Sequence, residues 1–268
     1  MLTAAAIQMS SGSDKRANLD RADALVRIAA SRGAGLIVLP EVFSWRGARG
    51  AEAENADSIP GPTTERLSAL ARELVIHLQA GSLTERIEGD RRCYNTALLF
   101  APNGDLVAQY RKIHLFDVEI PGQVSARESE ARKPGTDVVV ARTAIGAIGL
   151  SVCYDLRFPE LYRRLVKAGA EILSIPSAFT FPTGAAHWEP LVRARAIENQ
   201  CYVVAPDQYG TSPNGYRDYG GSIIVDPWGT VVARASEGET VILAEIDLDY
   251  LRRVRKELPS LTHARLAT

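Results

Sequence analysis

The chain has 268 residues, of which 46% are hydrophobic and 24% charged, and its formal net charge is -1 at pH 7. This balance gives no electrostatic reason to expect a nucleic acid or an anionic membrane as a partner. No segment approaches the ~18 apolar residues of a membrane span, and residues 1–9 lack the basic region of a signal peptide. Length and composition therefore predict a globular protein, with residues 1–268 forming a single α/β domain.

Cysteine usage indicates a reducing compartment. Cys93, Cys153 and Cys201 are odd in number and far apart in the sequence. This spacing predicts neither a disulfide framework nor a zinc site. We therefore expect a cytoplasmic protein, in which Cys93 and Cys201 lie within strand patterns and belong to the core.

The first part of the chain alternates apolar strands with an amphipathic helix. Residues 1–9 are typical of a first strand, and Asp14 can cap a helix that runs to about Arg32 with its apolar residues on one face. Residues 35–40 form a short apolar run without polar alternation, which suits a strand covered on both faces. This strand ends at Glu41.

A polar loop, a helix and a series of strands follow. We interpret the polar stretch 46–62 as a loop over a site rather than a linker, and Thr63 or Thr64 opens a helix to about Leu74. An Asn-Gly pair predicts a hairpin turn between the last two strands of this part. The chain reaches Lys112 at the end of that ladder. The expected strands are 75–80, 94–100 and 106–111.

The second half of the chain continues the alternation. Residues 121–134, which include Glu128, are charged and expected to be irregular. A long helix over 186–199 contains Pro190, which is tolerated only in a first helical turn. The other expected elements are helices from Pro159 to Gly169 and from Asp247 to Pro259, and strands at 137–142, 147–152, 171–176, 201–205, 222–225, 231–234 and 241–246. Together these elements predict a mixed sheet system with helices outside it.

The strand over 147–152 stops abruptly at Cys153, and a short polar turn leads to the helix at Pro159. Such a turn lifts a thiol out of the sheet and places it near backbone N–H groups and the positive end of a helix, which favour the thiolate. The alternative is a small buried hydrophobic residue, since free cysteine is among the most buried residue types. The turn alone does not decide between these interpretations.

Three apolar strands end in chemically different residues, Glu41, Lys112 and Cys153. Catalytic groups of α/β proteins gather at strand ends, although an isolated strand-end Glu or Lys is more often a surface residue. A thiol needs a base or a cation to attack at neutral pH. Glu41 can take the proton and return it to a leaving amine, while Lys112 and the Tyr154 N–H stabilise an oxyanion.

These segments resemble the nitrilase or carbon–nitrogen hydrolase superfamily. Its Glu-Lys-Cys triad matches Glu41 in Leu-Pro-Glu, Lys112 in Tyr-Arg-Lys-Ile-His-Leu and Cys153 in Val-Cys-Tyr-Asp-Leu-Arg-Phe-Pro-Glu. A second glutamate that orients the triad lysine in this family matches Glu128. The resemblance covers nearly the whole chain and implies a four-layer α-β-β-α sandwich of two mixed sheets with helices outside. It also implies homodimers or larger homo-oligomers and no metal or organic cofactor.

Further segments are similar to the branch that contains deaminated-glutathione amidase and ω-amidase. They are residues 116–122, 186–189, 193–204 and 225–229, of which the first favours the deaminated-glutathione amidase type. The branch implies a cysteine-dependent amidase that uses water to hydrolyse the carboxamide of a small carboxylate-bearing substrate, releasing ammonia through a thioester intermediate. ω-Amidase, N-carbamoyl hydrolase and, as the least favoured, true nitrilase stay open. A catalytically silent binding or scaffold protein on the same fold also stays open.

Two positions depart from this branch. Gly221 stands where the branch usually has a histidine, and Trp45 stands where relatives often carry a smaller or phenolic side chain. Both changes predict a reshaped pocket and therefore leave room for an altered specificity.

The resemblance also implies residues that bind the substrate. Arg157 matches an arginine that faces a substrate carboxylate, and its planar fork suits that task; an ion pair with Glu160 is the alternative. Phe179 and Thr183 match pocket positions, with simple loop packing as the alternative. The predicted substrate-binding set is Trp45, Tyr154, Arg157, Phe179 and Thr183.

Two histidines invite a Cys-His interpretation. Neither His114 nor His187 follows an obvious orienting acid in the sequence, so we expect structural roles for both. His187 and Glu189 lie within one helical turn, but no third ligand accompanies them, and no metal site is predicted. Glu189 and Arg193 have the spacing of a helical salt bridge.

Overall fold

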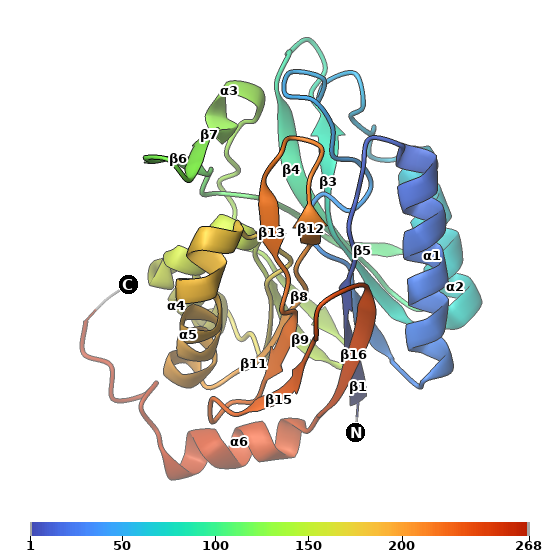
Figure 1. Ribbon diagram of the computed structural model, residues 1–268. Helices are drawn as coiled ribbons and strands as arrows, with labels where there is room; N and C mark the ends of the chain where they lie inside the picture. Colours follow the sequence, from blue (N-terminus) through green and yellow to red (C-terminus); the bar gives the residue numbers. More distant parts are fainter. Residues whose placement is uncertain (1, 267–268) are drawn as a thin grey trace.

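Two six-stranded sheets lie face to face between two layers of helices in the computed structural model, which describes residues 2–266 (Figure 1). Both sheets combine parallel and antiparallel strand pairs. The predicted four-layer α-β-β-α sandwich is therefore confirmed. Met1, which belongs to the expected first strand, lies outside the described residues.

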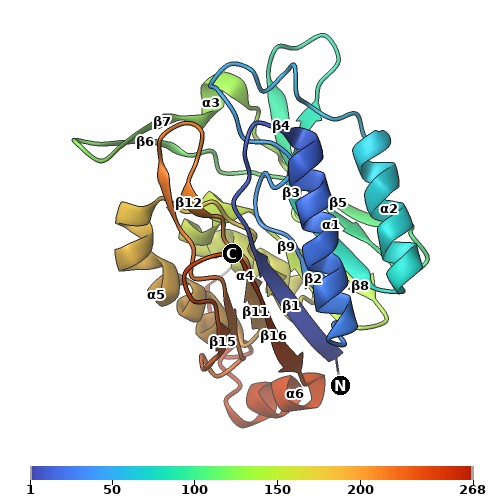
Figure 2. The same cartoon turned by 45° about the vertical axis from the view of Figure 1, so that its right-hand side comes forward.

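The first sheet is covered on its outer face by two helices, α1 (Lys15–Ser31) and α2 (Pro62–Leu74) (Figure 2). As predicted, Asp14 caps the N-terminus of α1, and its side chain accepts a hydrogen bond from the Ala17 N–H. Apolar side chains of both helices pack on the sheet in one buried cluster. In spatial order the strands are β16 (Thr240–Ile246), β1 (Leu2–Gln8), β2 (Leu36–Val38), β3 (His77–Arg86), β4 (Cys93–Phe100) and β5 (Leu106–Arg111).

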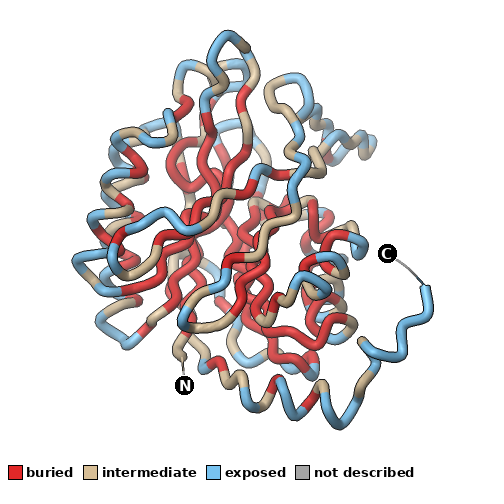
Figure 3. Tube along the Cα trace, turned by 180° about the vertical axis from the view of Figure 1, so that it is seen from behind, coloured by how far each residue is buried: buried red, intermediate tan, exposed pale blue. Residues whose placement is uncertain are grey.

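The second sheet is covered by α4 (Pro159–Lys167) and α5 (Phe181–Asn199). A last helix, α6 (Leu248–Glu257), starts at Asp247, which accepts hydrogen bonds from two N–H groups of its first turn, as predicted. Figure 3 shows that the buried chain is concentrated in the two sheets. In spatial order the strands are β15 (Val231–Arg234), β14 (Ile223–Val225), β11 (Tyr202–Ala205), β10 (Ile172–Ser174), β9 (Gly146–Leu150) and β8 (Val140–Thr143).

The expectation of irregular structure over residues 121–134 is wrong. A hairpin of β6 (Asp117–Ile120) and β7 (Val124–Arg127) leads into the short helix α3 (Glu128–Ala131). These strands are too short and too exposed for an alternating pattern to stand out. A second small hairpin, of β12 (Tyr209–Thr211) and β13 (Arg217–Tyr219), was not predicted for the same reason.

Helix α5 begins at Phe181, earlier than predicted, so Pro190 lies inside the helix rather than in its first turn. Proline has no N–H, and the Ala186 carbonyl therefore lacks its usual helical partner. The helix persists because side chains such as Trp188 and Val192 are fully buried in the core that covers the second sheet. Tertiary packing outweighs the local preference at this position.

Strand β3 extends to Arg86, beyond the predicted residue 80, and its register with β4 shifts between Ala80 and Leu83. Within this irregularity a Cβ on Gly81 would lie 1.6 Å from the Leu39 carbonyl oxygen. Only glycine therefore allows β3 to approach the segment that leads to Glu41. Among residues 2–266, no helix combines the length and apolar character that a bilayer crossing requires.

Candidate active site

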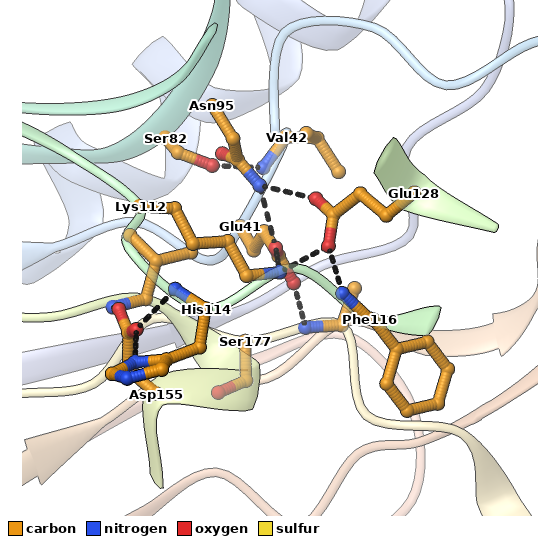
Figure 4. Close-up of polar contacts among 12 residues, drawn as sticks. Glu41, Val42, Ser82, Asn95, Lys112, His114, Phe116, Glu128, Asp155 and Ser177 are labelled. Carbon is orange, nitrogen blue, oxygen red and sulfur yellow. Dashed lines mark hydrogen bonds and ion pairs between the residues drawn. The ribbon is translucent and has the colours of Figure 1, made fainter. Parts of the chain in front are cut away.

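Glu41, Lys112 and Glu128 come together beyond the ends of the strands that precede them (Figure 4). The Lys112 Nζ lies 2.9 Å from Glu41 Oε1 and 2.9 Å from Glu128 Oε2. Lys112 is 2% exposed and Glu41 is 4% exposed, so these two residues are almost completely removed from solvent, while the Glu128 side chain is 12% exposed. Buried charges of this kind are tolerated only when they are paired and hydrogen-bonded, as they are here.

Cys153 joins the same cluster. Its thiol lies beside the Glu41 carboxylate and the Ala178 N–H, close enough for both groups and Lys112 to shift its pKa. The Ala178 N–H also donates to Glu41 Oε2 at 2.9 Å. The structure thus brings together the base, the cation and the thiol that the strand-end argument selected.

Burial raises the pKa of the Cys153 thiol well above its ordinary value, and the Glu41 carboxylate raises it further, while Lys112 offsets only part of the effect. Burial alone would lower the pKa of Lys112, but Glu128 and Glu41 outweigh it and raise that pKa. The pKa of Glu128 is lowered because Lys112 and Arg132 outweigh the opposite effect of burial. At neutral pH the site therefore holds a neutral thiol beside a charged Lys112–Glu128 pair.

Asn95, in the middle of the β3–β4–β5 ladder, was not predicted as a site residue. Its side chain touches both glutamates, as Figure 4 shows. In the sequence it is one of two adjacent polar residues, Asn95 and Thr96, that precede an apolar run, and no local pattern sets it apart. Only the folded structure places it beside the triad.

Backbone strain is concentrated at the site. Among residues 2–266, four residues other than glycine have positive φ, and two of them, Gln200 and the β-branched Val75, are helix C-caps, where the left-handed conformation is common. The other two are Cys153, at 48°, and Val42, at 47°, directly after Glu41. A β-branched residue in this region is a conformational outlier, and such outliers persist where the surroundings fix them. Here Ser82 Oγ accepts the Val42 N–H at 2.9 Å.

A cavity of about 780 Å³ opens onto Glu41, Lys112 and Cys153. This volume lies within the range of small-molecule sites. Most of the predicted substrate-binding residues line it, namely Trp45, Tyr154, Phe179 and Thr183. Several residues of the loop over 46–62 line it as well, as far as Glu54, which agrees with the prediction that this loop lies over the site.

Arg157 is not among the residues that line the cavity. Its guanidinium lies 5.9 Å from the ring centre of Tyr154 and 5.1 Å from that of Phe179, both of which do line it. Its nearest polar partner is His187 Nδ1, at 3.4 Å, and no ion pair with Glu160 is present among the described residues. Arg157 thus stands behind the two rings without a carboxylate partner.

The sequence that builds this site and fold is similar to those of known proteins. Residues 3–256 match the sequence profile described as carbon-nitrogen hydrolase. This chain belongs to the carbon–nitrogen hydrolase family. Human deaminated glutathione amidase is 48% identical to it, over 97% of this chain and 81% of its own length. Omega-amidase NIT2 of Xenopus tropicalis is 44% identical, over 91% of this chain and 88% of its own length.

The family also accounts for the fold. The crystal structure of the C. elegans NitFhit protein superimposes with a TM-score of 0.91 at 42% identity, covering 98% of this chain and 65% of that longer chain. The protein is accordingly an amidase-type hydrolase that acts on carbon–nitrogen bonds other than peptide bonds.

In this carbon–nitrogen hydrolase, an ion pair and two hydrogen bonds that were not predicted from the sequence connect the loops around the cavity. Arg46 binds both carboxylate oxygens of Asp218 in β13, and this pair is nearly buried. Burial raises the pKa of Asp218, although Arg46 counteracts it. Farther out, Arg49 contacts the Tyr216 hydroxyl and the Ser125 carbonyl. Three segments far apart in the sequence therefore meet over the cavity.

His114 has an acidic partner that was not evident from the sequence. Its Nδ1 lies 2.7 Å from Asp155 Oδ1, and its ring stacks on Phe158. Asp155 is fully buried and also accepts hydrogen bonds from the Tyr110 hydroxyl and the Val152 N–H. The acid lies far from His114 in the sequence, so spacing gave no signal. Asp155 ties the end of β5 to the turn that carries Cys153.

The other predicted residues have structural surroundings. Cys93 and Cys201 are buried, as expected. Glu189 lies 3.9 Å from Arg193 and closer to Arg234. Within residues 2–266, no cluster of three His, Cys, Asp or Glu side chains is arranged to hold a metal ion.

Gly221 has a φ of +64°, and a Cβ added there would lie 3.2 Å from the Tyr219 ring. The carbonyl of Gly221 accepts a hydrogen bond from the Trp188 indole at 2.9 Å. A side chain at this position would therefore crowd the Tyr219 ring and strain the backbone, and Gly221 is not among the residues that line the cavity.

Proposed function

We propose that this protein hydrolyses the terminal carboxamide of a small carboxylate-bearing substrate, with deaminated glutathione as the type of substrate. The observation that carries the proposal is the contact of Glu41 with both the Cys153 thiol and the Lys112 ammonium at the base of one cavity. The name of the human relative supports the substrate class.

In the first step, the Cys153 sulfur attacks the amide carbon while Glu41 takes the thiol proton. A neutral thiol with a raised pKa needs such a base at the moment of attack. The C–S bond forms, the carbonyl π pair moves to oxygen, and Lys112 and the Tyr154 N–H stabilise the oxyanion. Glu128 keeps Lys112 charged and in place for this task.

In the second step, the oxyanion collapses and the C–N bond breaks. Glu41 returns its proton to the leaving nitrogen, so ammonia departs and a thioester to Cys153 remains. A water molecule then gives its proton to Glu41 and attacks the thioester carbon. Breaking the C–S bond releases the carboxylic acid and restores the thiol with the proton held by Glu41.

We propose that the walls of the cavity select the substrate. Trp45, Phe179 and Thr183 line it beside the thiol and supply apolar and hydroxyl contacts. Arg157 lies behind the rings of Tyr154 and Phe179 and has no acidic partner among residues 2–266, which leaves its fork available to a substrate carboxylate if the rings move aside. ω-Amidase activity is the alternative within this class, in line with the name of the Xenopus relative.

We also propose that residues 1–268 fold as one domain, that the protein assembles as a homodimer or larger homo-oligomer, and that it works in the cytoplasm. Three buried free cysteines are compatible with a reducing compartment. Light scattering after size-exclusion chromatography tests the assembly, and a monomer mass near 29.1 kDa would contradict it.

The decisive experiment compares kcat/KM for deaminated glutathione, α-ketoglutaramate, N-carbamoyl amino acids and simple nitriles, with ammonia release as the measurement. We expect deaminated glutathione to give the highest value. Preference for α-ketoglutaramate would move the assignment to ω-amidase. Turnover of nitriles without turnover of any amide would overturn the proposal.

A further inference from the structure

Asn95 is hydrogen-bonded to all three residues of the ion triad beside Cys153. Its side-chain Nδ2 donates to Glu41 Oε1 at 2.8 Å and to Glu128 Oε1 at 3.3 Å. Its main-chain carbonyl accepts the Lys112 N–H at 2.8 Å. We propose that Asn95 is a positioning residue that fixes the two glutamates around Lys112, and that turnover at Cys153 depends on it. This inference rests on the proposed amidase function.

The contacts form a closed ring, which Figure 4 shows. Lys112 bridges Glu41 Oε1 and Glu128 Oε2 on one side, and the Asn95 amide bridges Glu41 Oε1 and Glu128 Oε1 on the other. Two carboxylates that share one ammonium repel each other. The amide group placed between them supplies N–H donors to both without adding a charge.

The ring sets the direction in which Glu41 points. One of its oxygens is held by Lys112 and Asn95, and the other is held by the Ala178 N–H next to the thiol. Without the Asn95 donor, the first oxygen keeps a single partner, and the carboxylate gains freedom to rotate away from the sulfur. A proton acceptor must lie within hydrogen-bond reach of the proton that it takes, so such rotation slows the reaction.

Stability alone does not explain an asparagine at this position. Asn95 is 1% exposed, and its Oδ1 has no hydrogen-bond partner among the described residues. A buried carbonyl oxygen without a donor is a cost to folding, and an apolar side chain of the same size avoids it. Turning the amide over would place this oxygen against two carboxylates. The side chain is therefore explained by its donor group and by what that group holds.

The test is Asn95→Leu, which keeps the size of the side chain and removes the donor. We expect kcat for the best amide to fall by about 10²-fold, the effect of a misplaced catalytic group, while KM changes by less than about threefold. Alkylation of Cys153 by iodoacetamide, followed by mass spectrometry, should slow by about tenfold, because proton removal by Glu41 is impaired. Because two buried carboxylates lose a donor, the melting temperature should fall by a few degrees, and the kinetics are therefore measured well below it.

Asn199→Leu is the matched control. Asn199 is also fully buried and has an unpartnered Oδ1, but its Nδ2 donates within α5 to Arg195 and Glu198, away from the cavity. This variant should keep the kcat and the alkylation rate of the wild type. If it loses as much kcat as Asn95→Leu, the inference is wrong, because the loss then reflects a buried asparagine in general.

An Asn95→Leu enzyme with kcat and alkylation rate within twofold of the wild type also overturns the inference. If this variant does not fold, Asn95→Asp replaces it, because aspartate preserves the shape of the side chain and places an acceptor where the donor was. We expect the same losses of kcat and alkylation rate. Values within twofold of the wild type would again overturn the inference. A wild-type enzyme that hydrolyses none of the amides contradicts the proposed function instead. The alkylation rates then still test the positioning of Glu41.

Discussion

Two buried thiols of this protein have similar surroundings at first sight but different chemistry. Cys153 and Cys201 are both buried, burial raises the pKa of both, and each has a cation nearby, Lys112 in one case and Arg255 in the other. Cys201 Sγ lies 3.3 Å from two backbone carbonyl oxygens and 3.1 Å from the Arg255 guanidinium. Only Cys153 contacts a carboxylate and lines the cavity.

The comparison teaches that burial and a neighbouring cation do not make a nucleophile. A thiol whose pKa is raised stays protonated at neutral pH and needs a base in contact with it. Cys201 has hydrogen-bond acceptors without proton-accepting capacity at neutral pH and no access to a substrate, so it serves the junction between α6 and the second sheet. Cys153 has the base, the cation and the open space together.

The largest expected effect comes from removing the sulfur of each thiol in turn. Cys153→Ala should lower amide turnover by at least about 10⁴-fold, because no covalent intermediate can form, while Cys201→Ala should keep turnover within about twofold. Ammonia release measured on both folded variants checks this. If both variants lose turnover to a comparable extent, the conclusion that only Cys153 acts as a nucleophile is wrong.

The next effect tests the base that only Cys153 has. Glu41→Gln keeps the shape of the side chain but cannot accept a proton, and we expect kcat to fall by about 10³-fold. The matched control is Glu85→Gln, because Glu85 is also buried and paired with an arginine but does not line the cavity. An active Glu41→Gln enzyme would show that the thiol needs no carboxylate.

A smaller effect is expected from the partner of the cation. Glu128→Gln leaves Lys112 with one carboxylate instead of two, and kcat should fall by about 10-fold to 10²-fold, since the ammonium is then less firmly oriented. Steady-state kinetics on one amide measure it. Glu130→Gln, which changes a neighbouring residue that lines the cavity without an ion pair among the described residues, should leave kcat almost unchanged.

The smallest effect concerns stability rather than rate. Burial raises the pKa of Cys201 to about 12. Because the folded state keeps a proton that the unfolded chain loses from about pH 8.5, stability is fully present below that pH and decreases as pH rises toward 12. Between pH 8 and 9.5, the free energy of unfolding should fall by about 1 kcal/mol more in the wild type than in Cys201→Ala. Denaturant titrations that show parallel pH dependence would contradict this.

The residues that could be predicted from the sequence are those that end apolar runs. Glu41, Lys112 and Cys153 interrupt strand patterns, and the rule that active groups gather at strand ends makes them candidates, which the family resemblance then selects. Glu128 came from family resemblance alone, because its hairpin and helix are too short to leave a periodic pattern.

The residues that could not be predicted act through tertiary contacts. Asn95 and Asp155 lie inside or beside regular elements, and their partners are far away in the sequence. Arg46 and Asp218 are charged residues of loops and short strands, whose pairing depends on how two distant segments fold over the cavity. No local pattern distinguishes such residues from ordinary polar positions.

The left-handed backbone at Val42 and Cys153 sets a limit on how heat-resistant this enzyme can become while it stays active. Glycine adopts such a conformation freely, whereas for other residues it costs about 1 kcal/mol or more of folding stability. A laboratory selection for variants that stay folded at high temperature, without a requirement for activity, should therefore favour glycine at these two positions. The Cys153→Gly substitution removes the sulfur that attacks the substrate. The Val42→Gly substitution gives the backbone beside Glu41 more conformational freedom, so the carboxylate of that base is held less firmly. Thermal robustness and turnover compete at the same two backbone sites.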